Sequence, residues 1–310
     1  MKRQEGSKPI LGGHEKFVFR YGWLKKGVDA VSRNHAIFAE DEALVILGVG
    51  KNMVRSIRYW CLATGLCEET RGKGSAHQLQ LTPLASQLMT DAGWDPYLED
   101  VGTLWLLHWQ IVTNPARTLV WHLTFCSYYE PEFTKQQLIN FIDKQLVRRG
   151  IAVTAGIVER EVDVCLRTYV PAMRNTPREV IPEETLSCPL AELDLLRFSV
   201  EDEIYRFNIG PKVTLPIHVF GYALFTFLSS IAPHRRTVAV DECIYRQGSP
   251  GQVFKLDENS VVEYLETLEE LTEGKLRLQE TIGLRQLYLN HDTSEWFLPT
   301  AFALLEQYYA

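Results

Sequence analysis

The stretch at residues 48–66, GVGKNMVRSIRYWCLATGL, constrains the fold most strongly. Lys51, Arg55 and Arg58 recur at helical spacing and share one side of a helix. Another side of the same helix is apolar and predicts a buried stripe, formed by Met53, Ile57, Trp60, Cys61 and Thr64. Glycines precede this helix, where they permit a tight turn, and Gly65 is placed to end it. The sequence therefore predicts an amphipathic helix with one basic side.

The segments on either side of this helix predict a winged helix-turn-helix. Residues 39–47, with an acidic first turn and an apolar remainder, predict a short preceding helix. Residues 66–81 predict two short strands around a glycine-rich tip that carries Arg71 and Lys73. Helix, turn, basic helix and basic hairpin follow one another as in a winged helix that binds DNA, where Asn52 would join the basic residues. The alternative is that these charges form an ordinary solvated face.

An aromatic and basic run precedes this region, at residues 12–31. Its aromatic residues alternate with other residues around Phe17 and Phe19, which predicts an extended segment. The basic residues interleaved with the rings are Arg20, Lys25 and Lys26. Such a mixture suits unstacked bases and phosphates. The alternative is that Phe17 and Phe19 pack into the core.

The net charge of -7 argues against a general polyanion binder, but the charge is unevenly spread. Residues 1–77 carry 13 Lys and Arg against 8 Asp and Glu, and the remainder carries 19 against 31. A basic head on an acidic body is expected if only the head contacts phosphate.

Composition also indicates the compartment. The opening residues 1–10 are polar and lack the apolar run of a secretory signal, and Asn114 and Pro115 interrupt the most apolar stretch. The six cysteines include no C-x-x-C pair, so neither a zinc knuckle nor a disulfide scaffold is indicated. We therefore expect a cytoplasmic protein that does not enter a membrane.

Beyond the head, the sequence predicts a mainly α chain of the α+β class. Helices are expected to begin with side-chain caps at Asp100, Thr134, Thr154 and Asp257. The helix expected after Thr154 completes a second helix-turn-helix in form. Its exposed side mixes Arg160 and Arg167 with the acids Glu159, Glu161 and Asp163. Phosphate would repel those acids, so we expect this helix to pack or to contact protein.

The predicted architecture is an N-terminal winged helix-turn-helix followed by a larger helical body with further winged-helix-like modules. The head is expected at residues 1–100 and a helical middle domain at residues 101–175. A C-terminal α+β domain is expected at residues 176–310, after a proline-rich linker.

A nuclease site would contain acidic residues, because metal-assisted cleavage of a phosphodiester needs clustered carboxylates, usually with a Lys or His. His14 and Glu15 are the first catalytic candidates, since they lie beside the basic head. The outline of a D…E-x-K nuclease core is a second candidate, formed by Asp257, Glu273 and Lys275. This triplet is common by chance. A nickase would use a divalent metal, Mn or Mg, because the candidate ligands are hard oxygens plus one imidazole, and otherwise no cofactor is expected.

Five segments occur in a fixed order along the chain: GHEKFVFRYGWLKKGVDAV, LGVGKNMVRSIRYWCLATGL, WDPYLEDVGTLWLLHWQIVTNPAR, CPLAEL and GSPGQVFKLDE. Together they resemble one bacterial family, the SspB-like family, formerly a domain of unknown function encoded beside DNA phosphorothioation genes. The resemblance runs from Gly12 to Tyr288.

The resemblance implies a component that binds and nicks double-stranded DNA in a system of DNA modification and phage defence. This system replaces a non-bridging phosphate oxygen of DNA with sulfur. The implied protein partners are a cysteine desulfurase, an ATPase and a PAPS-reductase-like enzyme, and an oligomer is compatible with the sequence. The resemblance assigns no catalytic residue. Two alternatives stay open: a non-catalytic DNA-recognition subunit of the same system, and a winged-helix transcriptional regulator.

Overall fold

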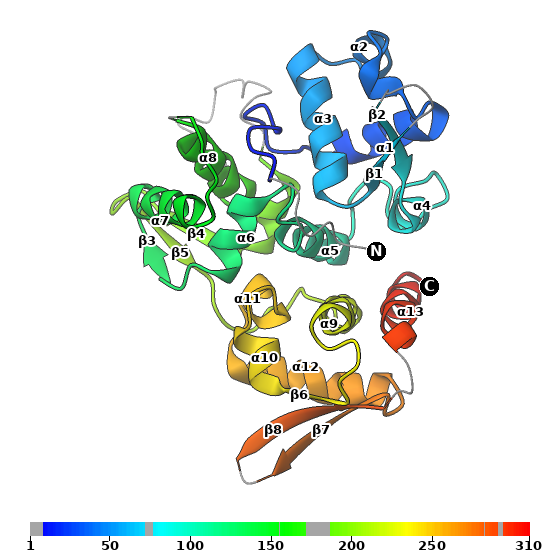
Figure 1. Ribbon diagram of the computed structural model, residues 1–310. Helices are drawn as coiled ribbons and strands as arrows, with labels where there is room; N and C mark the ends of the chain where they lie inside the picture. The colour runs from blue at the N-terminus through cyan, green and yellow to red at the C-terminus, as the bar shows by residue number, and fades with distance from the viewer. Residues whose placement is uncertain (1–8, 72–76, 155, 172–186, 282, 291–293) are drawn as a thin grey trace. The chain divides into compact units, whose positions relative to one another are not determined.

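The structure is a computed structural model, and it describes residues 9–71, 77–154, 156–171, 187–281, 283–290 and 294–310 (Figure 1). The chain forms two compact units. Unit 1 comprises residues 1–124 and 132–206, and unit 2 comprises residues 125–131 and 207–310. Both units combine helices with short strands, in agreement with the expected α+β class. The three-domain boundaries expected from the sequence stay a prediction.

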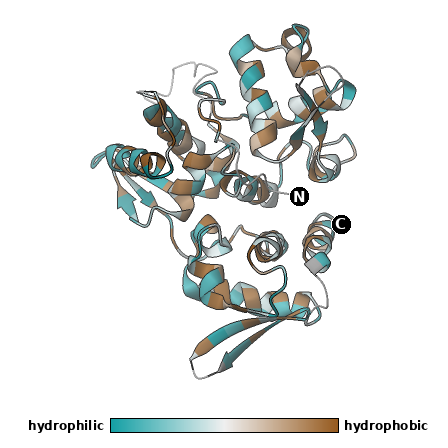
Figure 2. Ribbon diagram, viewed as in Figure 1, coloured by the Kyte–Doolittle hydropathy of each residue, from teal (hydrophilic) through white to brown (hydrophobic). Residues whose placement is uncertain are grey.

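The first part of unit 1 contains α1 (Trp23–Arg33), η1 (Ile37–Ala39), α2 (Ala43–Leu47), α3 (Lys51–Ala63), β1 (Cys67–Arg71), β2 (His77–Leu81) and α4 (Pro83–Leu88). The expected amphipathic helix is confirmed as α3, and Figure 2 shows apolar and polar residues alternating around it. Ile57 and Trp60 are fully buried, while Met53 is half-buried. The amide of Asn114 donates to the carbonyls of Leu62 and Ala63 at 3.2 and 3.1 Å, which satisfies acceptors at the end of α3.

The second part of unit 1 contains α5 (Val101–Val112), α6 (Leu119–Cys126), β3 (Glu132–Phe133), α7 (Lys135–Arg148), α8 (Ile157–Tyr169), η3 (Pro189–Leu193), β4 (Leu196–Ser199) and β5 (Ile204–Phe207). Two expected caps are confirmed. Asp100 accepts a hydrogen bond from the amide of Gly102 at 2.6 Å, and Thr134 forms a capping box with Gln137.

The expected start of α8 is wrong. The N-cap of α8 is Gly156, in the left-handed conformation and without a side-chain cap, so Thr154 lies outside the helix. Glu161 was also expected on the exposed side, but only 1% of its side chain is exposed. A carboxylate is buried only where hydrogen bonds or charges compensate its lost hydration, and the partners of Glu161 come from a distant part of the chain.

Unit 2 contains α9 (Ile217–Ile231), β6 (Thr237–Ala239), α10 (Val240–Tyr245), α11 (Pro250–Phe254), α12 (Glu258–Leu271), β7 (Leu276–Thr281), β8 (Leu284–Leu289), η4 (Ser294–Trp296) and α13 (Phe297–Tyr309). The strands form an antiparallel sheet in the order β6-β8-β7, and α9 packs against α13. The expected cap at Asp257 is confirmed, since its carboxylate accepts from the amide of Ser260 at 2.9 Å. Within the described parts of both units, no helix has the length and apolar character needed to cross a membrane.

Candidate nucleic-acid interface

The N-terminal half of α3 presents polar side chains to solvent. Lys51, Asn52 and Arg55 are exposed, whereas the opposite side of the helix is buried around Trp60. Gly50 precedes the helix in an extended conformation, after the left-handed Gly48 that ends α2. The two helices and this turn therefore place three solvent-exposed polar side chains at the start of α3.

Arg58 lies on the same helix but has a protein partner. Its guanidinium donates to Glu69 of β1 at 2.6 Å, and Arg117 donates to the other oxygen of the same carboxylate at 2.5 Å. Burial acts to raise the pKa of Glu69, but the two guanidinium groups outweigh burial and the pKa is lowered. Arg58 is thus engaged in a network that ties α3 to its neighbours.

Arg20 is buried beneath aromatic rings. Its guanidinium carbon lies 4.9 Å from the centroid of the Trp23 ring and 5.8 Å from that of Phe17. Such cation–π contacts hold a guanidinium within a fold. The structure therefore places Arg20 inside unit 1 and not on its surface.

The two lysines of α1 differ in exposure. Lys25 is buried, and its ammonium donates to Asp29 at 2.5 Å and to Asp91 at 2.7 Å. Lys26 is exposed, and its ammonium donates to the carbonyl of Leu47 at 3.1 Å, at the end of α2. Both cations contact protein groups, and Lys26 alone of the two is open to solvent.

The hairpin expected after α3 is confirmed as β1 and β2, which pair antiparallel from Cys67 opposite Leu81 to Arg71 opposite His77. The side chain of Arg71 and all of Lys73 lie outside the described part of the structure. Their predicted contacts with DNA stay a prediction.

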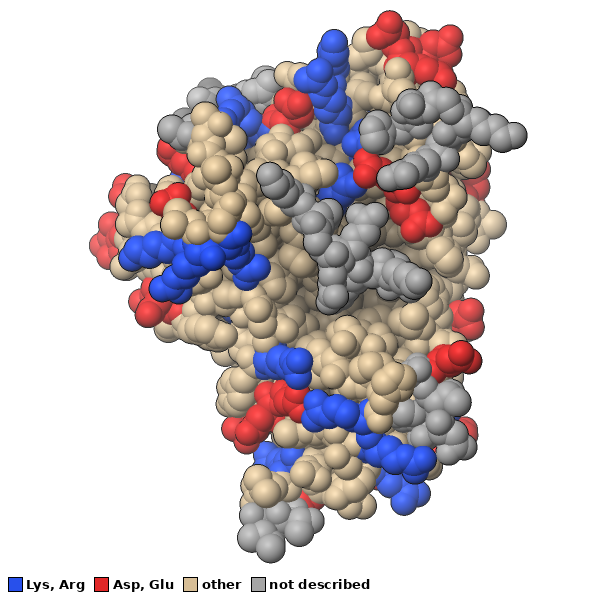
Figure 3. All heavy atoms as spheres, in the orientation of Figure 1, with Lys and Arg blue, Asp and Glu red and all other residues tan. Residues whose placement is uncertain are grey.

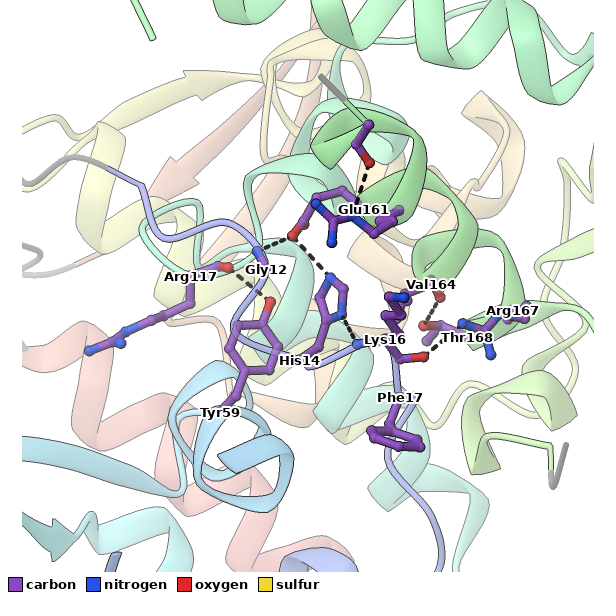
Figure 4. Close-up of polar contacts among 12 residues, drawn as sticks. Gly12, His14, Lys16, Phe17, Tyr59, Arg117, Glu161, Val164, Arg167 and Thr168 are labelled. Atoms are coloured by element: carbon purple, nitrogen blue, oxygen red, sulfur yellow. Dashed lines mark hydrogen bonds and ion pairs between the residues drawn. The ribbon is translucent and has the colours of Figure 1, made fainter. Parts of the chain in front are cut away.

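The first catalytic candidate, His14, is buried and engaged through both ring nitrogens. Nε2 lies 2.9 Å from Oε1 of Glu161 on α8, and Nδ1 lies 3.1 Å from the amide of Lys16 (Figure 4). An ionised carboxylate only accepts and a backbone amide only donates, so this network assigns the neutral tautomer with its proton on Nε2. The amide of Gly12 donates to the same Oε1. His14 could bind a metal or accept a proton only if this hydrogen-bond network were broken first.

A cleft of about 720 Å³ lies beside this pair, within unit 1. Its lining comes from three places: Gly12, His14, Glu15, Lys16 and Phe17 of the turn at residues 12–17 (the 12–17 turn), Asn52 of α3, and Ile157, Arg160 and Arg167 of α8. The structure therefore brings the aromatic and basic run near the chain start together with α3 and with α8.

The cleft is electropositive. Among the described residues, the ammonium of Lys16 has no hydrogen-bond or ion-pair partner, and the guanidinium of Arg160 donates only to the carbonyl of Gly156, at 3.1 Å. Arg167 donates to Asp163 at 3.0 Å and to the carbonyl of Lys16 at 2.8 Å. Figure 3 shows Lys and Arg in separate groups interspersed with Asp and Glu, so the coloured surface on this face carries no continuous basic patch. Positive charge is therefore local.

Glu15, the second catalytic candidate, lines the same cleft. One of its oxygens lies 3.3 Å from the guanidinium of Arg55. Its carboxylate is thus the one acidic lining group of the cleft among the described residues, and it borders the exposed side of α3.

The residues of the second nuclease candidate lie far apart in the structure. Asp257 caps the start of α12, while Glu273 and Lys275 follow the end of this 14-residue helix. A helix of this length spans about 21 Å, which is far beyond the reach of two carboxylates that share a metal.

The described residues do not fit a protein-built metal centre. They contain no group of three or more His, Cys, Asp or Glu side chains that could hold a metal ion. Oε2 of Glu161 is buried and has no hydrogen-bond partner among the described residues, but one carboxylate oxygen is not a ligand set.

Several residues of this region were missed as site residues from the sequence, namely Lys16, Arg160, Glu161 and Arg167. Glu161 positions the 12–17 turn, and Arg160 supplies charge to the cleft. A basic residue beside acids on an expected amphipathic helix gave no signal that the helix would face the chain start. The long-range contacts of Glu161 with His14 and of Arg167 with the carbonyl of Lys16 reveal it.

Comparison with known proteins places the chain in a family. Residues 11–309 match the family described as "Protein of unknown function (DUF4007)". One solved structure, "Magnesium ion-bound SspB crystal structure", is 29% identical with a TM-score of 0.87, and the alignment covers 98% of this chain and 88% of that one. A second, "SspB crystal structure", is 28% identical with a TM-score of 0.86 and the same coverage. No curated protein matches. The chain belongs to the DUF4007 family and is similar to SspB over almost its whole length, as the sequence resemblance implied.

Proposed function

We propose that this protein is a DNA-binding component of a bacterial DNA phosphorothioation system, in which α2, α3 and the β1–β2 hairpin form a winged helix. The observation that carries the proposal is the exposure of Lys51, Asn52 and Arg55 at the start of α3, above a buried opposite side. Recognition helices contact base edges through their N-terminal residues. The likeness to SspB supports the assignment to this system.

The three exposed residues divide between two kinds of contact. Asn52 suits adenine, and Arg55 suits guanine, through paired hydrogen bonds in the major groove. Lys51, a point charge at the helix start, suits a phosphate. Arg55 would exchange its contact with Glu15 for the DNA base.

The geometry best supports a protein that recognises DNA without cleaving it. Both ring nitrogens of His14 are engaged, and Asp257 lies at the opposite end of α12 from Glu273. No catalytic step therefore follows from these residues. Cooperation with a cysteine desulfurase, an ATPase and a PAPS-reductase-like enzyme is part of the proposal.

Binding to random-sequence duplex DNA over a series of salt concentrations tests the proposal. Affinity should fall as salt rises, because cationic side chains release counterions from DNA. Lys51→Ala should reduce the slope of log affinity against log salt by roughly one. Arg148→Ala, at an exposed position of α7, is the matched control and should leave the slope unchanged.

DNA nicking is the second candidate function. One observation favours it: a similar SspB crystal structure is magnesium ion-bound. Incubation of the purified protein with supercoiled plasmid and Mg²⁺ or Mn²⁺ tests it. Open circles that disappear in the Glu15→Gln protein would establish nicking and place the cleft in it, whereas intact plasmid alongside retained DNA binding would leave recognition as the function.

A further inference from the structure

We infer that the cleft between the 12–17 turn and α8 binds a single nucleotide unit, and that its source is a nucleotide displaced from the DNA bound by α3. The identity of the source rests on the proposed function. The chemistry of the pocket, cations for a phosphate and an apolar wall for a base, rests on the cleft alone.

The size of the cleft selects the ligand. A volume of about 720 Å³ lies within the roughly 300–1,000 Å³ of pockets that enclose small molecules. The major groove of B-form DNA alone is about 12 Å wide, so a duplex would lie across the mouth of the cleft. One unpaired nucleotide is small enough to enter, and enzymes and readers that act on a displaced base hold it in such a pocket.

Positive charge in the cleft supplies the phosphate contact. Lys16 of the 12–17 turn and Arg160 of α8 both line the cleft, and neither has a carboxylate partner among the described residues. An ammonium and a guanidinium that are free of carboxylates are available to an incoming phosphate. Arg167 of α8, which already donates to Asp163, adds a further positive charge to the lining of the cleft.

The remaining lining suits a base. Phe17 of the 12–17 turn and Ile157 of α8 are half-buried and line the cleft, so it has an aromatic and an aliphatic surface. A base stacks on an aromatic ring with a gain that is nearly independent of sequence. Glu15 offers a carboxylate to a base edge, and Asn52, which also lines the cleft, belongs to the exposed start of α3. The pocket is thus continuous with the predicted recognition helix.

The backbone of the 12–17 turn supports this assignment. Glu15 and Lys16 have positive φ angles of 49° and 70°, a conformation that is uncommon for residues other than glycine. The amide of Lys16 is held by Nδ1 of His14, which is held in turn by Glu161. Backbone strain that the surrounding structure maintains is concentrated at ligand sites.

The experiment compares binding of a matched duplex with binding of the same duplex carrying one bulged nucleotide. Displacing a base from a matched pair costs free energy that a bulged nucleotide does not require. The wild-type protein should bind the bulged duplex about tenfold more tightly. Arg160→Gln and Phe17→Leu should lose this preference, and Arg148→Gln should retain it. A parallel titration with deoxyadenosine monophosphate measures the pocket without a duplex.

The outcomes separate the inference from the proposed function. Equal affinity of the wild-type protein for both duplexes, together with no binding of the monophosphate, overturns the inference even if duplex binding is strong. Arg160-dependent binding of the monophosphate without a preference for the bulge supports the pocket and makes a free nucleotide its ligand. If no duplex binds, the proposed function fails, and the monophosphate titration still decides the inference.

Discussion

Nε2 of His14 and Oε1 of Glu161 lie 2.9 Å apart, each side chain is 1% exposed, and 147 positions of sequence separate them. This contact holds the 12–17 turn against α8 and so defines one wall of the cleft. The His–Glu pair thus fixes the position of the 12–17 turn at the cleft.

Replacing Glu161 with Ala should therefore destabilise unit 1. The change removes the acceptor for both Gly12 and the neutral, buried His14, and a buried donor left without an acceptor typically costs about 1–3 kcal/mol. Denaturant unfolding followed by tryptophan fluorescence measures it. The exposed neighbour Glu159 is the control, and Glu159→Ala should change stability by less than about 0.5 kcal/mol. A loss of similar size in both proteins would show that the buried contact is unimportant.

Trp60→Ala should unfold the first part of unit 1 and leave no selective change in DNA recognition. The ring is fully buried, packs 5.3 Å from Phe19 and 5.6 Å from Trp121, and donates to the carbonyl of Phe17 at 3.0 Å. Substitutions of this size cost about 3–5 kcal/mol. Thermal melting and near-ultraviolet circular dichroism check it. A folded variant with altered sequence preference would instead place Trp60 at the DNA.

The Arg58→Ala substitution tests whether Arg58 stabilises the fold or contacts DNA. Because Arg58 is paired with Glu69, its loss should lower the free energy of unfolding by up to about 1 kcal/mol and leave DNA affinity near that of the parent. Melting and binding measured on the same preparation test this. A DNA affinity reduced equally for all sequences, with unchanged stability, would assign Arg58 to a phosphate.

Lys255 should give unit 2 a stability that rises with pH. Burial lowers the pKa of Lys255 to about 8, and its ammonium donates to the carbonyl of Phe125 at 2.6 Å and lies 4.2 Å from the Phe207 ring. Above this value the unfolded chain still binds the proton that the folded chain has released, so stability should increase between about pH 8 and pH 10.

The free energy of unfolding should rise by about 3 kcal/mol in total. Below pH 8 the folded state contains the buried ammonium and is destabilised by its full desolvation cost. Lys255→Met should remove this rise. Cys126, whose pKa burial raises to about 12, opposes the rise in the wild-type protein, so the two proteins are compared across the same pH range. Parallel stability curves of the two proteins across this range would contradict the prediction.

The parts of the fold that were predictable are those with a local cause. The apolar stripe of α3, the caps at Thr134 and Asp257 and the β1–β2 hairpin each depend on residues within a few positions of one another. The cleft was not predictable, because its walls meet only after Glu161 accepts from Gly12 and His14. Lys25 shows the same limit, since one of the two carboxylates that accept from its ammonium belongs to Asp91, 66 positions along the chain.

The claim that α3 is the recognition helix is tested most directly by comparing the DNA sequence preference of the wild-type protein with that of the Arg55→Ala protein. A preferred site is first selected from a random duplex library, and affinities for this site and for unrelated duplex are then measured. We expect Arg55→Ala to weaken binding to the preferred site by about 1–3 kcal/mol while affinity for unrelated duplex changes little. Arg33→Ala, at an exposed position of α1, should behave as the parent. If Arg55→Ala folds normally and binds the preferred site as tightly as the parent does, α3 is not the recognition helix and its charges form a solvated face.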